Sequence, residues 1–448
     1  MTGEELLAIG VRVAERAERH EQIEAFVAAG DRTSIRAYEG EVESFTQATT
    51  AGIGVRVVRD GRQGFAHAGT LDPDIVGEVV AEARDNLAFA QVDPHAGLAE
   101  PDGVEPPSLD SWNRDLAGVS VDAKIAAAVE LERRVRTADP RISGVRTASY
   151  SDSSGAVAVA SSTGILATDR ASFCSIGVQA LARDGDENQT GYGFDVARSF
   201  GDLSVDKAAD DAVERAVRML GARQPRSERM TVVLEARMAS SIVGIVAGML
   251  SGDRVAKGRT PFGDRMGELV ASPLLSLKDD PTDVRSFAAD AFDGEGLASR
   301  ATPLITAGVL TGFLHDTWSA RRLGAESTAS AVRGTRSTPV AGARALAMTP
   351  GRGDLDELLE SVDRGILVQA MSGLHSGVNA ISGDFSVGIE GLAILDGRRS
   401  GAIREATMAS TVQRLLSGIA AVGGELEWQP GGTGACALVI DDVAISGS

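Results

Sequence analysis

Side chains that could bind a metal ion or move a proton are few and scattered in this chain. The five histidines are His20, His67, His95, His315 and His375. No two of them are four or five residues apart, which is the spacing that places two imidazoles on one face of a zinc-peptidase helix. His20 is followed by Glu21, but no second histidine completes the motif. The histidines therefore predict no self-contained zinc site.

The two cysteines are the remaining strong nucleophiles. Cys174 lies in a strand pattern and is interpreted as a packing residue. Cys436 follows the glycine-rich segment 430–435, and with His375 as base it could act as a thiol nucleophile. It could equally be a small buried apolar residue, because Ala437, Leu438 and Val439 follow directly. The chain contains no Gly-x-Ser-x-Gly elbow, P-loop or dinucleotide fingerprint.

Composition excludes several classes of function. A net charge of −19 without a compensating Lys/Arg-rich stripe argues against nucleic-acid binding. No run of eighteen apolar residues is present, so no membrane span is expected. Two cysteines are too few for a disulfide framework, and the acidic N-terminus is unlike a signal peptide. A cytoplasmic protein is expected.

The elements that must position these residues form an α+β pattern. Thr2 caps a predicted helix to about His20, and further helices are predicted at 73–90, 121–138, 204–221, 354–366 and 407–420. Alternating runs predict a β-meander over 23–68, with Asp60-Gly61 as a hairpin turn, and a further β-region over 143–195. Both halves are expected to contain mainly antiparallel sheet with flanking helices.

The length of 448 residues favours two domains. The polar stretch 221–227, which contains glycine and proline, follows a predicted helix and marks a boundary. We predict an N-terminal α+β domain at 1–222 and a C-terminal α+β domain at 223–448.

Several segments in order resemble the TldD/PmbA (TldD/TldE) family. In the N-terminal half these are Ser34–Gly40 with Glu43-Ser44, Gly52–Val57, Ser161–Gly164, Asp184–Asp186 and Gly191-Tyr192. In the C-terminal half they are Phe292–Gly296, Thr317–Gly324, Gly377–Asn379, Ser382–Ser386, Gly391, Asp396-Gly397, Ala421–Glu427 and the Cys436 segment. The resemblance covers nearly the whole chain and is closest to the PmbA/TldE branch.

The resemblance implies an inactive member of a pair of related subunits. The TldD branch binds zinc through two histidines of a His-Glu-x-x-x-His helix and a late cysteine. Counting back from Leu250–Asp253, the two histidine positions fall on Val243 and Gly248, the glutamate position on Gly244, and the third-ligand position on Cys436. One cysteine cannot hold a four-coordinate zinc ion. No catalytic residue and no metal are therefore expected in this chain, and zinc is expected in a TldD-like catalytic partner.

The resemblance also implies a heterodimer that cleaves unfolded or flexible peptides, in general proteolysis or in peptide maturation. The peptide would lie as an added strand in a narrow passage. Candidate wall residues are Asn379, Ser382, Gly383, Asp384 and Phe385, although Ser-Gly-Asp could be an ordinary turn. Arg321 is interpreted as a packing residue. Two alternatives remain: a peptide-binding homodimer without catalysis, or a stand-alone peptidase that uses Cys436.

Overall fold

The computed structural model describes residues 1–447 and divides into two compact units. Unit 1 contains Met1–Val217 together with two later segments, Asp290–Ser299 and His315–Ala341. Unit 2 contains Arg218–Ala289, Arg300–Leu314 and the chain from Gly342 onward. The first crossing lies a few residues before the predicted boundary at 222/223, whereas the two returns to unit 1 are not predicted by the sequence patterns.

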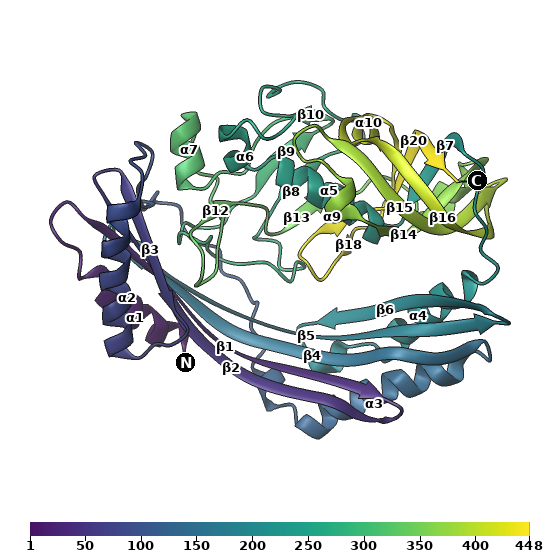
Figure 1. The fold of residues 1–448 in the computed structure, drawn as a ribbon, viewed down its shortest axis with the longest axis horizontal. Helices are drawn as coiled ribbons and strands as arrows, with labels where there is room; N and C mark the ends of the chain where they lie inside the picture. The colour runs from purple at the N-terminus through teal and green to yellow at the C-terminus, as the bar shows by residue number, and fades with distance from the viewer. Residues whose placement is uncertain (448) are drawn as a thin grey trace. The chain divides into compact units, whose positions relative to one another are not determined.

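Unit 1 is built on one antiparallel sheet of six strands in the order β3-β2-β1-β4-β5-β6 (Figure 1). The strands are β1 (Gln22–Tyr38), β2 (Glu41–Arg59), β3 (Arg62–Ala68), β4 (Ile142–Ser161), β5 (Leu166–Asp184) and β6 (Glu187–Ala197). Asp60 and Gly61 join β2 to β3 with φ of 52° and 70°, as a two-residue hairpin requires. This confirms the predicted turn.

A pair of glycines lies on the two central strands of this sheet. Gly30 of β1 is opposite Gly155 of β4. A Cβ atom on Gly30 would lie 2.8 Å from the carbonyl oxygen of Ser154, and one on Gly155 would lie 3.0 Å from that of Ala29. A side chain at either position would crowd the backbone of the neighbouring strand, which favours glycine at both. The long strands curve through this region (Figure 1).

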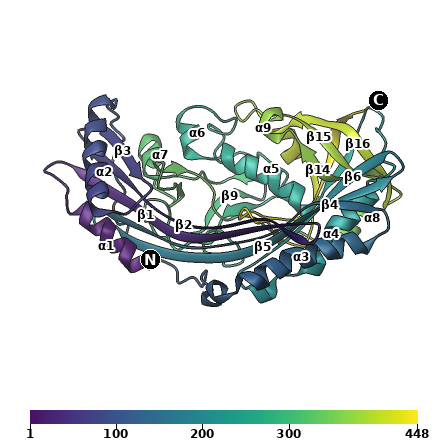
Figure 2. The same ribbon diagram turned by 60° about the horizontal axis from the view of Figure 1, so that its bottom comes forward.

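Helices cover one face of this sheet (Figure 2). They are α1 (Gly3–Ala14), α2 (Pro73–Asp85), α3 (Val121–Ala138) and α4 (Val205–Arg218). Because side chains alternate along a strand, Ile23, Ala25 and Val27 of β1 point to this face and form a core with α1 and α2. Thr2 caps α1, as predicted, and the structure adds a capping box with Glu5; α1 ends at Ala14 rather than His20.

The opposite face is covered at one end by the two returning segments of unit 1. Phe26 of β1 and Val159 of β4 point to this side and pack with Leu297 and Ala329. The N-terminal half of β1 is therefore buried on both faces, which explains its nearly continuous apolar run, 23–28.

Unit 2 contains two six-stranded sheets. The first has the order β16-β15-β14-β7-β20-β17, and an additional β16–β20 pairing closes five of its strands into a ring. These strands are β7 (Glu228–Leu234), β14 (Arg364–Ser372), β15 (Asp384–Leu395), β16 (Arg398–Thr411), β17 (Ile419–Val422) and β20 (Leu438–Ser446). β7 and β14 run parallel, and the other pairs of this sheet are antiparallel.

The second sheet of unit 2 has the order β10-β9-β8-β13-β19-β18. Its short strands are β8 (Leu277–Asp279), β9 (Thr302–Thr306), β10 (Val309–Leu310), β13 (Leu346–Met348), β18 (Glu427–Trp428) and β19 (Gly434–Ala435). Helix α5 (Ala236–Met249) follows β7 and packs against β19. The shorter helices of this unit are α6 (Gly252–Ala256), α8 (Leu355–Glu360), α9 (Leu374–Gly377) and α10 (Val412–Ser417).

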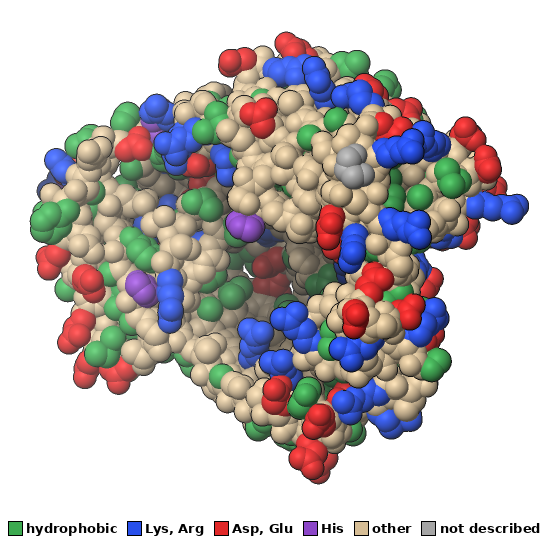
Figure 3. Space-filling view, turned by 45° about the vertical axis from the view of Figure 1, so that its right-hand side comes forward, with side chains coloured by type: hydrophobic (Ala, Val, Ile, Leu, Met, Phe, Trp, Pro, Cys, Tyr) green, Lys and Arg blue, Asp and Glu red, His purple; other side chains and the backbone are tan. Residues whose placement is uncertain are grey.

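The α+β class with mainly antiparallel sheets is confirmed. The predicted helix at 407–420 is wrong in its first part: residues 407–411 belong to β16 and pair with β15, and only Val412–Ser417 is helical. Among residues 1–447, every helix is too short or too polar to cross a bilayer. On the face shown in Figure 3, acidic and basic side chains are interspersed.

Candidate functional site

Helix α5 carries the three positions that the resemblance assigns to the lost zinc motif. Val243 is 1% exposed and packs into the core of unit 2, so a side chain at this position points away from solvent. Gly244 and Gly248 lie on the exposed side of the helix, and a Cβ atom at either would meet no atom within 4 Å. The helix therefore has an apolar buried face and a bare exposed face that offers no metal ligand.

Cys436 lies between β19 and β20 and is fully buried in the same core cluster as Val243. Burial, with a contribution from nearby Glu427, raises the pKa of its thiol to about 11. The thiolate is the form that attacks carbonyl groups and binds metals, and it is scarce at neutral pH when the pKa is this high. His375, by contrast, lies exposed on α9. This geometry does not favour a Cys436–His375 nucleophile.

These residues do not fit a zinc ion. Val243, Gly244 and Gly248 have no donor atoms, and the thiol of Cys436 is held protonated in an apolar core. Within residues 1–447, no three His, Cys, Asp or Glu side chains are grouped so that they could hold a metal ion. We therefore assign no step of metal chemistry to this chain.

The candidate wall segment is a turn that satisfies its own polar groups. The side-chain oxygen of Asn379 accepts hydrogen bonds from the backbone N–H groups of Ile381 (2.9 Å) and Ser382 (3.3 Å). The Ser382 hydroxyl donates to Asp384 (2.6 Å). Gly383 has a φ of 85°, which favours glycine. These contacts support the interpretation as an ordinary turn.

The five candidate wall residues differ in solvent exposure. Asn379, Ser382 and Asp384 are exposed, whereas Gly383 is buried. Phe385 is 2% exposed and packs in the core of unit 2. The side chain of Phe385 is therefore not part of any surface that a peptide could contact, and this residue is removed from the wall set.

A buried network of charged side chains lies in unit 1. Arg56 of β2 is opposite Glu24 of β1, and its Nη2 lies 3.0 Å from a Glu24 carboxylate oxygen. The same nitrogen lies 3.0 Å from Oε1 of Glu295, which comes from the first returning segment. Arg333, from the second returning segment, pairs with the other oxygen of Glu24 and stacks 5.1 Å from the ring centre of Phe26. The four charged side chains are at most 4% exposed.

Neighbouring charges outweigh the effect of burial on Glu24 and Arg56, whereas burial still lowers the pKa of Arg333. Burial alone would raise the pKa of Glu24, but Arg56 and Arg333 hold it below the ordinary value. Burial alone would lower the pKa of Arg56, but Glu24 and Glu295 raise it. The second oxygen of Glu295 accepts a hydrogen bond from the backbone N–H of Thr317 (2.8 Å). The network therefore joins two strands to both returning segments.

Segments that carry the family resemblance meet at this network. Gly52–Val57 supplies Arg56, Phe292–Gly296 supplies Glu295, and Thr317–Gly324 begins at the helix α7 (Thr317–Leu323). In α7, Trp318 donates to Asp93 (2.7 Å) and Arg321 donates to the carbonyl oxygen of Leu98 (2.7 Å). The packing role expected for Arg321 agrees with this contact.

The sequence patterns did not single out Glu24, Arg56 or Arg333. One signal was available: Glu24 and Arg56 interrupt apolar runs, Ile23–Ala28 and Ile53–Val58, at positions that should be buried. A charged residue is rarely buried unless it is paired. The partner Glu295, far away in sequence, could not be found from local patterns.

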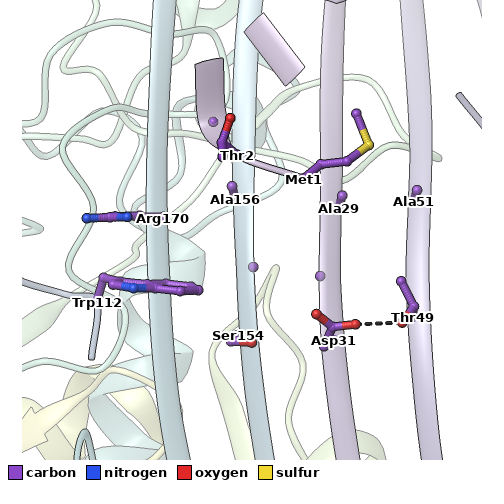
Figure 4. A pocket seen from close by; sticks show the side chains of 13 residues that line it. Met1, Thr2, Ala29, Asp31, Thr49, Ala51, Trp112, Ser154, Ala156 and Arg170 are labelled. Atoms are coloured by element: carbon purple, nitrogen blue, oxygen red, sulfur yellow. Dashed lines mark hydrogen bonds between the residues drawn. The ribbon is translucent and has the colours of Figure 1, made fainter. Parts of the chain in front are cut away.

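A hollow of about 210 Å³ lies on the helix-covered face of the unit 1 sheet (Figure 4). Several of its polar side chains contact one another: Asp31 accepts a hydrogen bond from Thr49 (2.5 Å), and Arg170 lies 5.2 Å from the ring centre of Trp112. The remaining lining is Met1, Thr2, Gly3, Ala29, Gly30, Ala51, Ser154, Gly155 and Ala156. This lining does not indicate acid–base chemistry.

The two exposed glycines of α5, Gly244 and Gly248, lead to a prediction about stability. Glycine in a helix interior is destabilising by roughly 0.5–1 kcal/mol relative to alanine, and both glycines have room for a methyl group. We expect Gly244→Ala with Gly248→Ala to raise the free energy of unfolding by about 1–2 kcal/mol. Urea denaturation would measure this. A large loss of stability would show that these positions need glycine for a close contact.

Comparison with known proteins agrees with this architecture. Residues 227–447 match the PmbA/TldA metallopeptidase C-terminal domain, 114–220 its central domain and 23–87 its domain 1. Metalloprotease PmbA of Escherichia coli O157:H7 is 26% identical over 397 residues, which cover 88% of this chain and 85% of that protein. A metalloprotease TldD homolog of Haemophilus influenzae is 27% identical over 425 residues, 89% of this chain and 87% of that protein.

A solved structure shares the fold. TldE from Thermococcus kodakarensis superposes with a TM-score of 0.88 at 23% sequence identity, and the match covers 99% of both chains. The three matched domains together span most of the sequence. The chain is a member of the PmbA/TldD metallopeptidase family.

Proposed function

We propose that this chain is the non-catalytic subunit of a heterodimeric zinc metallopeptidase. Its partner is a TldD-like chain that carries the His-Glu-x-x-x-His helix, the zinc ion and the catalytic base. The observation that carries the proposal is helix α5, to which the resemblance assigns the zinc motif, and which presents Gly244 and Gly248 to solvent and Val243 to the core. The substrates are unfolded or flexible peptides, and the place of action is the cytoplasm.

The similarity to a TldD homolog supports a partner of the same fold, because the match covers 89% of this chain. Two related chains can form a pseudo-symmetric dimer through equivalent surfaces. In such a dimer this chain orders the catalytic subunit and supplies part of the wall along the bound peptide. A subunit that binds only the folded partner also stabilises it by mass action.

Reconstitution tests this proposal. The chain, a TldD-like homologue with the complete motif, and their mixture are assayed with a flexible fluorogenic peptide and sized by light scattering. We expect a one-to-one complex, hydrolysis by the mixture that chelation abolishes, and no hydrolysis by this chain alone. Replacing the glutamate of the partner's motif is the control that must abolish activity. A chain that forms only homodimers and leaves the homologue's activity unchanged would refute the pairing.

A further inference from the structure

The half of the unit 1 sheet that is distant from the returning segments has an open face. Alternation along β1 places Thr33, Ile35 and Ala37 in buried positions, and directs Arg32, Ser34 and Arg36 to the other side. Arg32 and Arg36 are exposed and Ser34 is half-buried. The register between strands then identifies the residues that share this side.

Small hydroxyl side chains occupy much of this open side, here called the hydroxyl face. One row crosses four neighbouring strands and consists of Thr46, Ser34, Ser151 and Ser175. The flanking rows add Ser44, Ser149 and Ser153. The Ser151 and Ser175 hydroxyl oxygens are 2.9 Å apart, and Ser149 donates to the carbonyl oxygen of Gly177 (3.3 Å).

Short hydroxyl groups rather than long charged side chains predominate on this part of the sheet, although 24% of the residues in the chain are charged. A hydroxyl group is short and can both donate and accept a hydrogen bond. A row of hydroxyl groups can therefore bond the N–H and C=O groups of a polypeptide regardless of its side chains.

The hydroxyl face carries two arginines, Arg32 and Arg36, although the chain as a whole has a net charge of −19. Arg36 pairs with Glu43 (2.7 Å), at the β1–β2 end of the face. Arg32 lies between Ala48 and Ser153 in its row, and makes no side-chain hydrogen bond or ion pair with any residue in 1–447. An exposed guanidinium group without a partner is suited to a carboxylate, which it can bind in a bidentate manner.

Aromatic side chains border the hydroxyl face along β5 and β6. Phe173 is opposite Ser153, and it is 37% exposed. Tyr192 is 44% exposed, lies beside Gly177 and stacks on Phe194 with ring centres 5.8 Å apart. Exposed aromatic rings next to polar groups are typical of surfaces that bind another chain.

We propose that the hydroxyl face binds an extended peptide segment that carries carboxylate side chains. The hydroxyl groups bond the peptide main chain, and Arg32 pairs with a carboxylate. This inference rests on the proposed function. It assigns the contact with the peptide to the sheet of unit 1 instead of the 379–385 turn. Peptides rich in Asp and Glu are then the preferred substrate class.

Peptide binding by this chain alone tests the inference. The probe is a fluorescein-labelled (Gly-Glu-Ser)₄ peptide, followed by fluorescence anisotropy, with (Gly-Lys-Ser)₄ as the comparison. We expect the Glu peptide to bind more tightly, and added salt to weaken its binding. Arg32→Glu should weaken it roughly ten- to a hundredfold. Arg12→Glu on α1 makes the same charge change at an exposed site on the helix side, and should leave binding unchanged.

A second variant tests the hydroxyl row. Ser34→Ala with Ser151→Ala should weaken binding of both peptides about equally, because it removes main-chain contacts. The inference is overturned if the Glu peptide fails to bind the pure chain, or if Arg12→Glu weakens binding as much as Arg32→Glu. It is also overturned if the peptide is displaced by maltoheptaose, an uncharged glucose oligomer that can bond the same hydroxyl groups but carries no carboxylate. The reconstitution assay does not depend on these outcomes: activity on mixing without an effect of Arg32→Glu would refute only this inference.

Discussion

Arg56→Met is expected to lower the free energy of unfolding by roughly 3–5 kcal/mol, the largest loss from any single substitution proposed for this chain. The reason is that Glu24 and Glu295, both at most 1% exposed, would keep buried carboxylates without their shared guanidinium partner. The hydrogen bond from the backbone N–H of Thr317 to Glu295 would remain, but a neutral donor does not balance the negative charge of the buried carboxylate. Chemical denaturation followed by circular dichroism measures the change.

Arg59→Met in the same strand is the matched control. Arg59 is 39% exposed, and its nitrogen lies 3.8 Å from Glu18 and 3.9 Å from Glu21. Half-exposed pairs at such distances contribute about 0–1 kcal/mol, so a loss in that range is expected. Equal losses in the two variants would show that the Arg56 network contributes no more than a surface pair.

Gly193→Val is expected to cost about 3 kcal/mol, at the upper end of what overpacking usually costs. Gly193 of β6 faces α4 directly: a Cβ atom would lie 2.0 Å from the carbonyl oxygen of Ala208 and 2.8 Å from the backbone nitrogen of Ala212. These are backbone atoms of a helix, so the clash is relieved only if α4 moves away from the sheet.

Gly401→Val in β16 is the control for a glycine in a strand, because a Cβ atom there would meet no atom within 4 Å. Its effect on the unfolding free energy should be within about 0.5 kcal/mol. Hydrogen exchange should also show faster exchange in α4 of Gly193→Val. Unchanged protection of α4 together with unchanged stability would contradict the close packing described for this helix.

Local patterns predicted the parts of the fold whose causes are local. The sequence pattern predicts a helix at 121–138, and the structure has α3 at Val121–Ala138, capped by Ser120. Asp60-Gly61 fixes the β2–β3 turn through two positive φ angles. Where pairing partners are distant, prediction failed: Met408 and Ala409 favour a helix, but residues 407–411 pair with β15 and form a strand.

The glycine at position 30 shows how a correct pattern can still mislead. The alternating pattern predicts two separate runs, 23–28 and 34–38, because Gly30 and polar neighbours interrupt the alternation. The structure has one strand of 17 residues, β1, in which Gly30 lies opposite Gly155 of β4 and a side chain would crowd the carbonyl group of Ser154. The return of segments 290–299 and 315–341 to unit 1 could not be predicted from local patterns. In the structure these segments are joined to the sheet by ion pairs between residues distant in sequence, Glu295 with Arg56 and Arg333 with Glu24.

The candidate site was predicted from the resemblance rather than from local chemistry. The missing donors at Val243, Gly244 and Gly248 can be read in the sequence, but which of them face solvent required the structure. The wall prediction included Phe385, because alternation alone does not tell which side of β15 faces the core. The hydroxyl face became visible only when the register aligned serines from four strands.

The most direct test of the account is the zinc content and peptidase activity of the purified chain. The protein is incubated with excess zinc, desalted, and analysed by mass spectrometry for metal and with the fluorogenic peptide for hydrolysis. We expect no retained zinc and no hydrolysis, because α5 and Cys436 provide no accessible set of ligands. One zinc ion retained per chain, with peptide hydrolysis that chelation removes, would contradict the assignment of this chain as a non-catalytic subunit.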